Sequence, residues 1–169
     1  MTPAASFAFT NYDDAATLRI EDTAGKVLAS YTREQLKQTF PIQEQETSTP
    51  WTQGNRKIRY RGPYLQDVLS TQHSTSKRVE ILAFDGFSTK LARSEIDRYA
   101  PILAIEKFCD DDDRTSGLCS AGQIYRALSL EDGGPIFLVW PMEKLPARYI
   151  PARNSIWVWF VVAVRLHNE

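Results

Sequence analysis

Histidine is scarce in this chain of 169 residues: His73 and His167 are the only two. His73 lies in a Ser/Thr-rich stretch and His167 lies close to the end of the sequence, so neither a His-rich zinc site nor a Ser-His-Asp triad is easily built. The sequence also lacks the G-x-G-x-x-G, G-x-x-x-x-G-K-[ST] and G-x-S-x-G patterns. Nucleotide cradles and nucleophile elbows therefore have no support in the sequence.

An excess of one charge and a long apolar run are missing as well. The 20 basic and 21 acidic residues give a net charge of -1, which predicts no general attraction to nucleic acid or to an anionic membrane. The longest apolar run, residues 156–164, is well short of the roughly 20 residues that a membrane-spanning helix needs. We therefore expect a soluble chain without direct membrane insertion. The opening segment MTPAASFAFT has no secretory signal pattern.

Cysteine is limited to Cys109 and Cys119, which flank the polar stretch DDDDRTSGL. A disulfide that closes this short loop would stabilise the fold by roughly 2–3 kcal/mol in the chain-entropy picture, and it would indicate an oxidising compartment such as the periplasm. Two free thiols in a cytosolic loop are the alternative. Because the loop has no histidine, a zinc site would be short of ligands, and we favour the disulfide.

The acidic run at residues 110–113 has the composition of a cation site but not the spacing of one. It lacks the alternating oxygen ligands, the glycine and the closing glutamate of an EF-hand loop. We expect a solvated acidic loop. If the loop binds anything, a cation or a basic partner surface is the physical expectation, and Asp111, Asp112 and Asp113 are the residues to test.

The chain shows no internal repeat and no long linker, which predicts a single domain over residues 1–169. Strands are expected at residues 16–22, 26–31, 56–61, 78–84, 88–93, 102–108, 135–140 and 155–166, with an extended segment at 40–49. Short helices are expected after Thr32, which forms a capping box with Gln35, after Pro63 in a first turn, and at residues 94–100. Many short strands with few short helices predict an α+β fold with a mixed or antiparallel sheet.

The chain has four tryptophans, and their positions differ in context. Trp51 follows a proline and Trp140 precedes one, each at the end of an extended segment where pockets form, so binding and core packing are both open for them. Trp157 and Trp159 are two residues apart on the predicted last strand. They would face the same side and give one sheet face a large aromatic surface.

Charged and polar side chains occur near the same places. Taken singly, each is most simply a turn former or a solvated group. Taken together, they suit a flat heterocycle with polar edges, which needs aromatic faces to stack on, a carboxylate for paired N–H donors and arginine for carbonyl or anionic groups. The residues concerned are Arg59, Tyr60, Arg61, Asp85, Arg148, Tyr149 and Arg153.

The ordered segments TPWTQG, YRGPYLQDVL, AFDGFSTKL, EIDRYAPILA, GGPIFLVWP and NSIWVWFVVAVRL resemble the small, stand-alone members of the sulfite-oxidase-type molybdopterin-binding fold. The resemblance covers residues from about 47 to 166, with an inserted loop at residues 109–119. In the enzymes of this fold, molybdenum is held by a pterin dithiolene and by one protein cysteine. The corresponding neighbourhood here, Thr49-Pro50-Trp51, has no cysteine, and neither Thr nor Trp replaces a soft thiolate.

Some small members of this fold are periplasmic pterin-binding proteins that act on a membrane-bound enzyme of cyclic di-GMP metabolism. The resemblance therefore implies a non-catalytic, metal-free pterin receptor in the periplasm, whose partner is the periplasmic domain of a membrane signalling protein. By position it implies Trp51 and Trp140 as stacking walls and Asp85 as the partner of the pterin amino edge. The complete implied set of ligand-binding residues is Trp51, Asp85, Tyr99, Trp140, Tyr149, Arg153 and Trp157.

Two alternatives stay open at the level of the sequence. One is an oxidoreductase of the sulfite oxidase type that carries the full molybdenum cofactor without a protein thiolate. The other is a structural or interaction module that has lost the pocket. A closed, filled cleft between Trp51 and Trp140 would favour this alternative.

Overall fold

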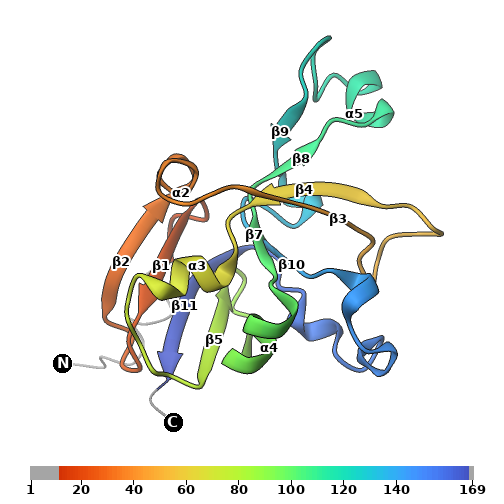
Figure 1. Cartoon of the computed structure of the whole chain (residues 1–169). Helices are drawn as coiled ribbons and strands as arrows, with labels where there is room; N and C mark the ends of the chain where they lie inside the picture. The colour runs from red at the N-terminus through yellow and green to blue at the C-terminus, as the bar shows by residue number, and fades with distance from the viewer. Residues whose placement is uncertain (1–11, 168–169) are drawn as a thin grey trace.

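A computed structural model of the chain describes residues 12–167, so the opening segment MTPAASFAFT lies outside the described residues. Its main sheet is five-stranded and mixed, in the order β2-β1-β11-β5-β6 (Figure 1). β1 runs parallel to β11, and the other neighbours are antiparallel. The strands are β1 (Thr17–Glu21), β2 (Val27–Thr32), β5 (Arg78–Ala83), β6 (Ser88–Ala92) and β11 (Val161–His167). The predicted hairpins β1–β2 and β5–β6 are confirmed.

Two smaller antiparallel sheets complete the β structure. One has four strands in the order β3-β4-β8-β9, and the other pairs β10 with β7. Their strands are β3 (Gln43–Thr47), β4 (Ile58–Gly62), β8 (Glu106–Phe108), β9 (Tyr125–Ala127), β7 (Ile102–Ala104) and β10 (Phe137–Val139). The fold is therefore α+β with both mixed and antiparallel sheets, as predicted.

The helices are short, and the sequence signals mark most of their ends. They are α2 (Arg33–Thr39), α3 (Leu65–Ser70), α4 (Arg93–Tyr99) and α5 (Asp111–Thr115), with the 3-10 turns η1 (Leu130–Asp132), η2 (Met142–Lys144), η3 (Ala147–Tyr149) and η4 (Asn154–Ile156). The predicted capping box of Thr32 and Gln35 is present at α2. Pro63 precedes the N-cap of α3 and so lies outside its first turn, which corrects the prediction. Within residues 12–167, none of the helices has the length and apolarity to cross a membrane.

A close backbone approach joins the sheets beside α3. A Cβ atom added to Gly62 would lie 1.8 Å from the carbonyl oxygen of Leu103. Since no side chain fits in that space, glycine is required where β4 passes β7 on its way into α3. A continuous apolar core fills the space around these strands, and its fully buried members include Leu18, Ile81 and Val164.

Two predicted strands are corrected by the structure. Residues 102–108 do not form one strand: the chain breaks at Ile105, whose N–H donates to the carbonyl of Arg61 at 2.8 Å, and β7 and β8 join different sheets. The predicted strand at residues 155–166 begins only at Val161, after η4 and an irregular segment. Phe160, with φ of 58°, turns the chain into β11. An apolar run is compatible with a strand or with a buried irregular segment, and periodicity does not separate the two.

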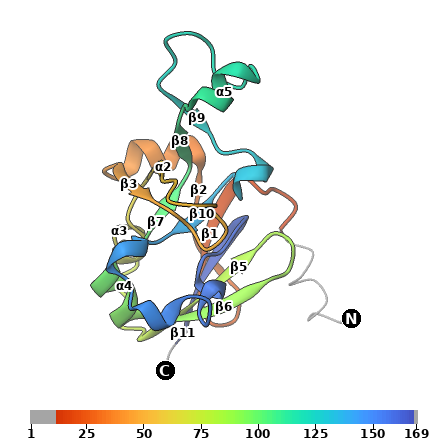
Figure 2. The same ribbon diagram turned by 90° about the vertical axis from the view of Figure 1, so that its right-hand side faces the viewer.

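The hairpin of β8 and β9 carries α5 away from the body as an arm (Figures 1 and 2). The predicted disulfide joins Cys109 and Cys119 across the arm. The acidic run is not simply a solvated loop, because Asp113 is 4% exposed and accepts hydrogen bonds from Lys107 and Arg126 at 2.7 and 2.8 Å. These ion pairs correct the prediction: two long basic side chains from neighbouring strands desolvate and neutralise the carboxylate.

Candidate functional site

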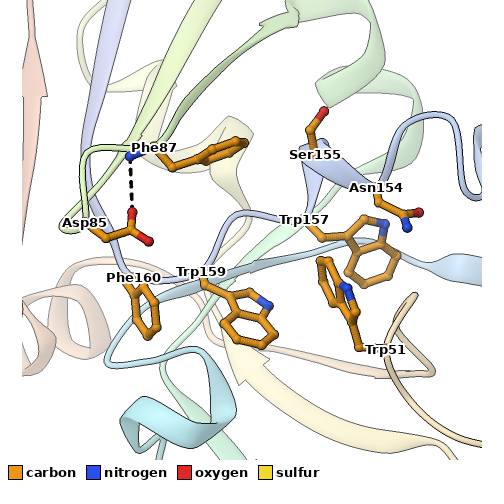
Figure 3. Close-up of a pocket in the computed structure, with 8 residues that line it drawn as sticks. All are labelled: Trp51, Asp85, Phe87, Asn154, Ser155, Trp157, Trp159 and Phe160. Atoms are coloured by element: carbon orange, nitrogen blue, oxygen red, sulfur yellow. Dashed lines mark hydrogen bonds between the residues drawn. The ribbon is translucent and has the colours of Figure 1, made fainter.

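A pocket of about 380 Å³ opens where three irregular segments meet (Figure 3). The β3–β4 loop contributes Trp51, and the turn between β5 and β6 contributes Asp85 and Phe87. The chain from η4 to β11 supplies the other walls. The lining residues are Trp51, Asp85, Phe87, Asn154, Ser155, Trp157, Trp159 and Phe160.

The β5–β6 turn presents one free carboxylate oxygen to this region. Asp85 Oδ1 accepts a hydrogen bond from the N–H of Phe87 at 3.1 Å, and Gly86 has φ of 93°, a conformation suited to glycine. Figure 3 shows this bond as a dashed line. Asp85 Oδ2 has no hydrogen-bond partner within the described part of the chain. An exposed carboxylate held by its own turn can thus accept hydrogen bonds from a ligand without losing the turn.

The aromatic walls of the pocket are unusually open for tryptophan and phenylalanine. Trp51, Phe87 and Trp159 are 49%, 43% and 37% exposed. Trp51 and Trp159 meet edge to face with 5.2 Å between ring centroids. Trp159 also packs edge to face against Phe160. Ring faces that remain accessible at a pocket mouth are suited to stacking against a flat ligand.

Two side chains that line the pocket each carry a buried polar atom without a partner within residues 12–167. The two atoms are the indole Nε1 of Trp157, whose side chain is 2% exposed, and the amide Oδ1 of Asn154. A buried polar group without a hydrogen bond costs about 1–3 kcal/mol. One is a donor and the other an acceptor. A ligand that offers both an acceptor and a donor would satisfy the two groups together.

The pocket has a carboxylate but no cation. None of its lining residues is lysine or arginine, and Arg153, next in sequence to Asn154, forms an ion pair with Glu95. A phosphate or other anionic group would therefore find no counter-charge among the lining residues. The electrostatics disfavour an anionic ligand and favour one that presents N–H donors to Asp85.

Of the seven residues predicted to bind ligand, Trp51, Asp85 and Trp157 line this pocket, while Tyr99, Trp140, Tyr149 and Arg153 do not. Trp140 is fully buried, and its Nε1 donates to the carbonyl of Ile156 at 2.7 Å. Its predicted role as a stacking wall is wrong, because β10 places the ring inside the core. Trp51 and Trp140 accordingly do not face each other across a cleft.

The other three predicted residues form a cluster behind η4. The Tyr149 hydroxyl donates to Glu95 at 2.8 Å, Arg153 forms an ion pair with the same carboxylate, and Tyr99 contacts Tyr149 edge to face. Burial by itself would raise the pKa of Glu95, but the hydrogen bonds from Tyr149 and Arg153 outweigh it and hold that pKa below its usual value. The cluster supports the pocket wall instead of lining it.

Sequence reasoning missed several lining residues. Phe87 had a signal, since it follows the Asp85-Gly86 turn, and Trp159 was recognised as aromatic surface but assigned to a strand. Asn154 and Ser155 carry no local signal of binding. They reach the pocket only because η4 folds back beside the β5–β6 hairpin.

A second cavity of about 410 Å³ lies on the other side of the tryptophan pair and shares Trp51 and Trp159 with the first. Thr49, from the segment where the resemblance would place a metal-binding cysteine, lines it, and its hydroxyl hydrogen-bonds with that of Thr52 at 2.8 Å. Neither Arg59 nor Arg61 lines it: Arg59 lies over Phe108 and Arg61 pairs with Glu106. The predicted arginine contacts are therefore structural ones of the arm.

The residues present do not suit a molybdenum ion held by a protein thiolate. Cys109 and Cys119 are buried in their disulfide, 2% and 4% exposed, and lie on the arm. Within residues 12–167, no group of three or more His, Cys, Asp or Glu side chains is placed to hold a metal ion. A disulfide has no thiolate to offer a soft metal.

Comparisons with known proteins bear on the fold. No protein-family model matches the chain, and no curated protein matches it in sequence. Among solved structures, the fold is similar to that of the sulfane dehydrogenase SoxCD from Paracoccus pantotrophus, with a TM-score of 0.53 and 16% sequence identity. The match covers 92% of this chain and 39% of the SoxCD chain. At this identity the likeness shows the fold alone, and it confirms the predicted α+β fold class of sulfite-oxidase type.

Proposed function

We propose that this protein binds a metal-free pterin in the pocket of Figure 3 and acts as a receptor without catalysis. The observation that carries the proposal is the pair of unpartnered buried polar atoms, Trp157 Nε1 and Asn154 Oδ1, on two side chains that line an aromatic pocket. A pterin combines a flat ring with a carbonyl acceptor and amino donors. It therefore supplies both missing partners and a face for stacking.

Asp85 adds a second polar contact at the pocket rim. Its free Oδ2 can accept from the amino edge of a pterin, where neighbouring N–H groups match a carboxylate. The absence of lysine and arginine from the lining favours a pterin without a phosphate over molybdopterin, which carries one. The accessible faces of Trp51 and Trp159 are the stacking surfaces in this proposal.

A titration of the purified, metal-free protein with a tetrahydropterin tests the proposal. Tryptophan fluorescence should change saturably, and calorimetry should give one site with micromolar or better affinity, about -8 kcal/mol or more favourable. The same titration with molybdate and with inorganic phosphate serves as the control and should give no saturable signal. An unchanged fluorescence with no heat of binding would overturn the proposal.

The second candidate is a molybdenum-cofactor oxidoreductase, which the likeness to a dehydrogenase fold favours. It requires the metal to be held without a protein thiolate. Metal analysis of protein purified from a host that makes the cofactor distinguishes the two. Molybdenum in a stoichiometric amount would support the second candidate, and a consistently metal-free preparation that binds a tetrahydropterin would support the receptor.

We further propose that the receptor is periplasmic and acts on the periplasmic domain of a membrane-bound signalling enzyme of the cyclic di-GMP type, as the resemblance implies. The disulfide supports an oxidising compartment. The arm is the proposed contact surface: Asp111 and Asp112 are exposed, while Leu118 and Ile124 are 55% and 54% exposed. Asp113 is buried, so it is not part of this contact surface, although the sequence had suggested it together with Asp111 and Asp112.

Charge reversal tests the arm. Asp111→Lys with Asp112→Lys should weaken binding to the signalling partner and leave the tetrahydropterin affinity unchanged, because the arm does not line the pocket. Partner binding that does not respond to these changes would remove the arm from the proposal.

A further inference from the structure

Glu95 has an unusual number of contacts for one carboxylate on a short helix. Its Oε1 accepts from the N–H of Ala92 at 3.3 Å and from Arg153 Nη2 at 3.2 Å. Its Oε2 accepts from the Tyr149 hydroxyl at 2.8 Å and from Arg153 Nη1. The Glu95 side chain is 14% exposed. Both oxygens are satisfied, and three of the four donors belong to Tyr149 and Arg153, in a segment far along the chain.

That segment leads directly into the pocket. Arg153 is the N-cap of η4, and its guanidinium also lies 4.9 Å from the centre of the Tyr149 ring. The Arg153 carbonyl accepts from the N–H of Ile156, and the Asn154 carbonyl accepts from the N–H of Trp157, so η4 is one hydrogen-bonded turn. A displacement of Arg153 is therefore expected to move Asn154 and Trp157 as well, because the same turn connects them.

The turn is held from its other side by the core. The Ile156 carbonyl accepts from Trp140 Nε1, and Ile156 and Trp157 are 1% and 2% exposed. Glu95, through Arg153, and Trp140, through Ile156, thus hold the two ends of η4. Asn154 within this turn and Trp157 directly after it line the pocket, and each carries a buried polar atom without a partner among the described residues. A bidentate Arg–carboxylate pair fixes the orientation of the guanidinium as well as its distance from the carboxylate.

We propose that Glu95 is a positioning residue that sets the pterin affinity of the pocket by holding Arg153, and through it Asn154 and Trp157, in place. The inference rests on the proposed function. Glu95 is not among the residues that line the pocket. Its role follows from rigid placement of binding groups, which requires a supporting set of contacts behind them.

The test compares Glu95→Gln with a matched control, Glu80→Gln. Glu80 is a similarly buried carboxylate, 17% exposed, that pairs with His167 on the main sheet, away from η4. The Glu95→Gln protein should bind a tetrahydropterin about tenfold more weakly, because a neutral amide cannot accept the paired guanidinium bonds. Glu80→Gln should bind like the parent. Equal affinities for parent and Glu95→Gln would overturn the inference.

A double-mutant cycle separates positioning from general destabilisation. If Glu95 acts through Asn154, then Glu95→Gln should lower affinity much less in an Asn154→Ala background than in the parent. Fully additive losses would contradict the proposed route. All affinities are measured well below the unfolding temperature of each variant, so partial unfolding does not contribute.

Hydrogen exchange tests the inference without ligand. The amides of Ile156 and Trp157, both hydrogen-bonded within η4, should exchange about tenfold faster in Glu95→Gln and at the parent rate in Glu80→Gln. Unchanged exchange would overturn the inference even if the tetrahydropterin binds. Failure of the parent to bind the tetrahydropterin, with exchange accelerated as expected, would refute the proposed ligand and retain Glu95 as the residue that holds η4.

Discussion

Trp51 and Trp159 meet edge to face at 5.2 Å between ring centroids, and this pair forms the wall between the two cavities. Trp51 comes from the β3–β4 loop and Trp159 from the segment before β11. The two rings are thus brought together only by the packing of distant elements. A ligand in either cavity would touch the same pair, so their substitution is the most direct probe of binding.

Trp51→Ala should lower the affinity for a tetrahydropterin by about tenfold, since it removes an aromatic face worth about 0.5–1.5 kcal/mol beyond its buried area. The unfolding free energy should change by less than about 1 kcal/mol, because the ring is half exposed. The matched control is Phe84→Ala, an aromatic residue of the same region that is 46% exposed and does not line the pocket. Calorimetry and urea unfolding give the two quantities.

Trp140→Ala, in contrast to Trp51→Ala, should lower the free energy of unfolding strongly. The fully buried ring and its hydrogen bond to Ile156 are lost together, so the unfolding free energy should fall by about 3–5 kcal/mol. Urea unfolding followed by far-UV circular dichroism measures this fall. A Trp140→Ala protein as stable as the parent would show that the ring does not pack in the core.

Two substitutions at Asp85 divide its roles. Asp85→Asn keeps an oxygen that can accept from the Phe87 N–H and should preserve the β5–β6 turn, while it removes the second carboxylate oxygen. Its affinity for a tetrahydropterin should fall about tenfold with little change in stability. Asp85→Ala should lower both the affinity for a tetrahydropterin and the free energy of unfolding. If Asp85→Asn bound the tetrahydropterin as tightly as the parent, the carboxylate would have no part in recognition.

The buried ion pairs of the arm predict an acid-sensitive stability. Burial by itself would raise the pKa of Asp113, but the hydrogen bonds from Arg126 and Lys107 outweigh it, and the folded-state pKa lies below the value of about 3.9 for an unfolded aspartate. The folded state therefore binds this proton less readily than the unfolded state. The stabilising contribution is fully present above about pH 4 and is lost as the pH falls through the folded pKa.

Asp113→Asn should accordingly cost about 3 kcal/mol near neutral pH, because it leaves two buried cations short of a partner. The difference from the parent should shrink below about pH 4. Asp112→Asn, at an exposed position of the same helix, is the control and should change stability little. A difference between parent and Asp113→Asn that stays constant down to about pH 3 would contradict the assigned ion pairs.

Much of the fold was predictable because its signals are local. Alternating apolar residues and the Asp85-Gly86 turn determine the β5–β6 hairpin, and Thr32 with Gln35 determines the start of α2. The short spacing of Cys109 and Cys119 in a polar loop was enough to favour their disulfide. Each of these features depends on residues a few positions apart, whose conformational preferences survive in any tertiary context.

The site was predictable only in part, because burial depends on contacts between distant segments. Trp51 and Trp140 both stand beside a proline, yet the tertiary structure leaves one half exposed at a pocket mouth and places the other in the core. The apolar run from Trp157 to Val164 is uniform in hydrophobicity, but it is divided at Phe160, where the chain turns from pocket wall into β11. The sequence by itself determined the short strands, their turns and the supply of aromatic rings. Which rings line the pocket was decided by the packing of η4 and the β3–β4 loop against the β5–β6 hairpin. The sequence does not determine this, because burying any aromatic ring against apolar surface is favourable wherever the fold offers such a surface.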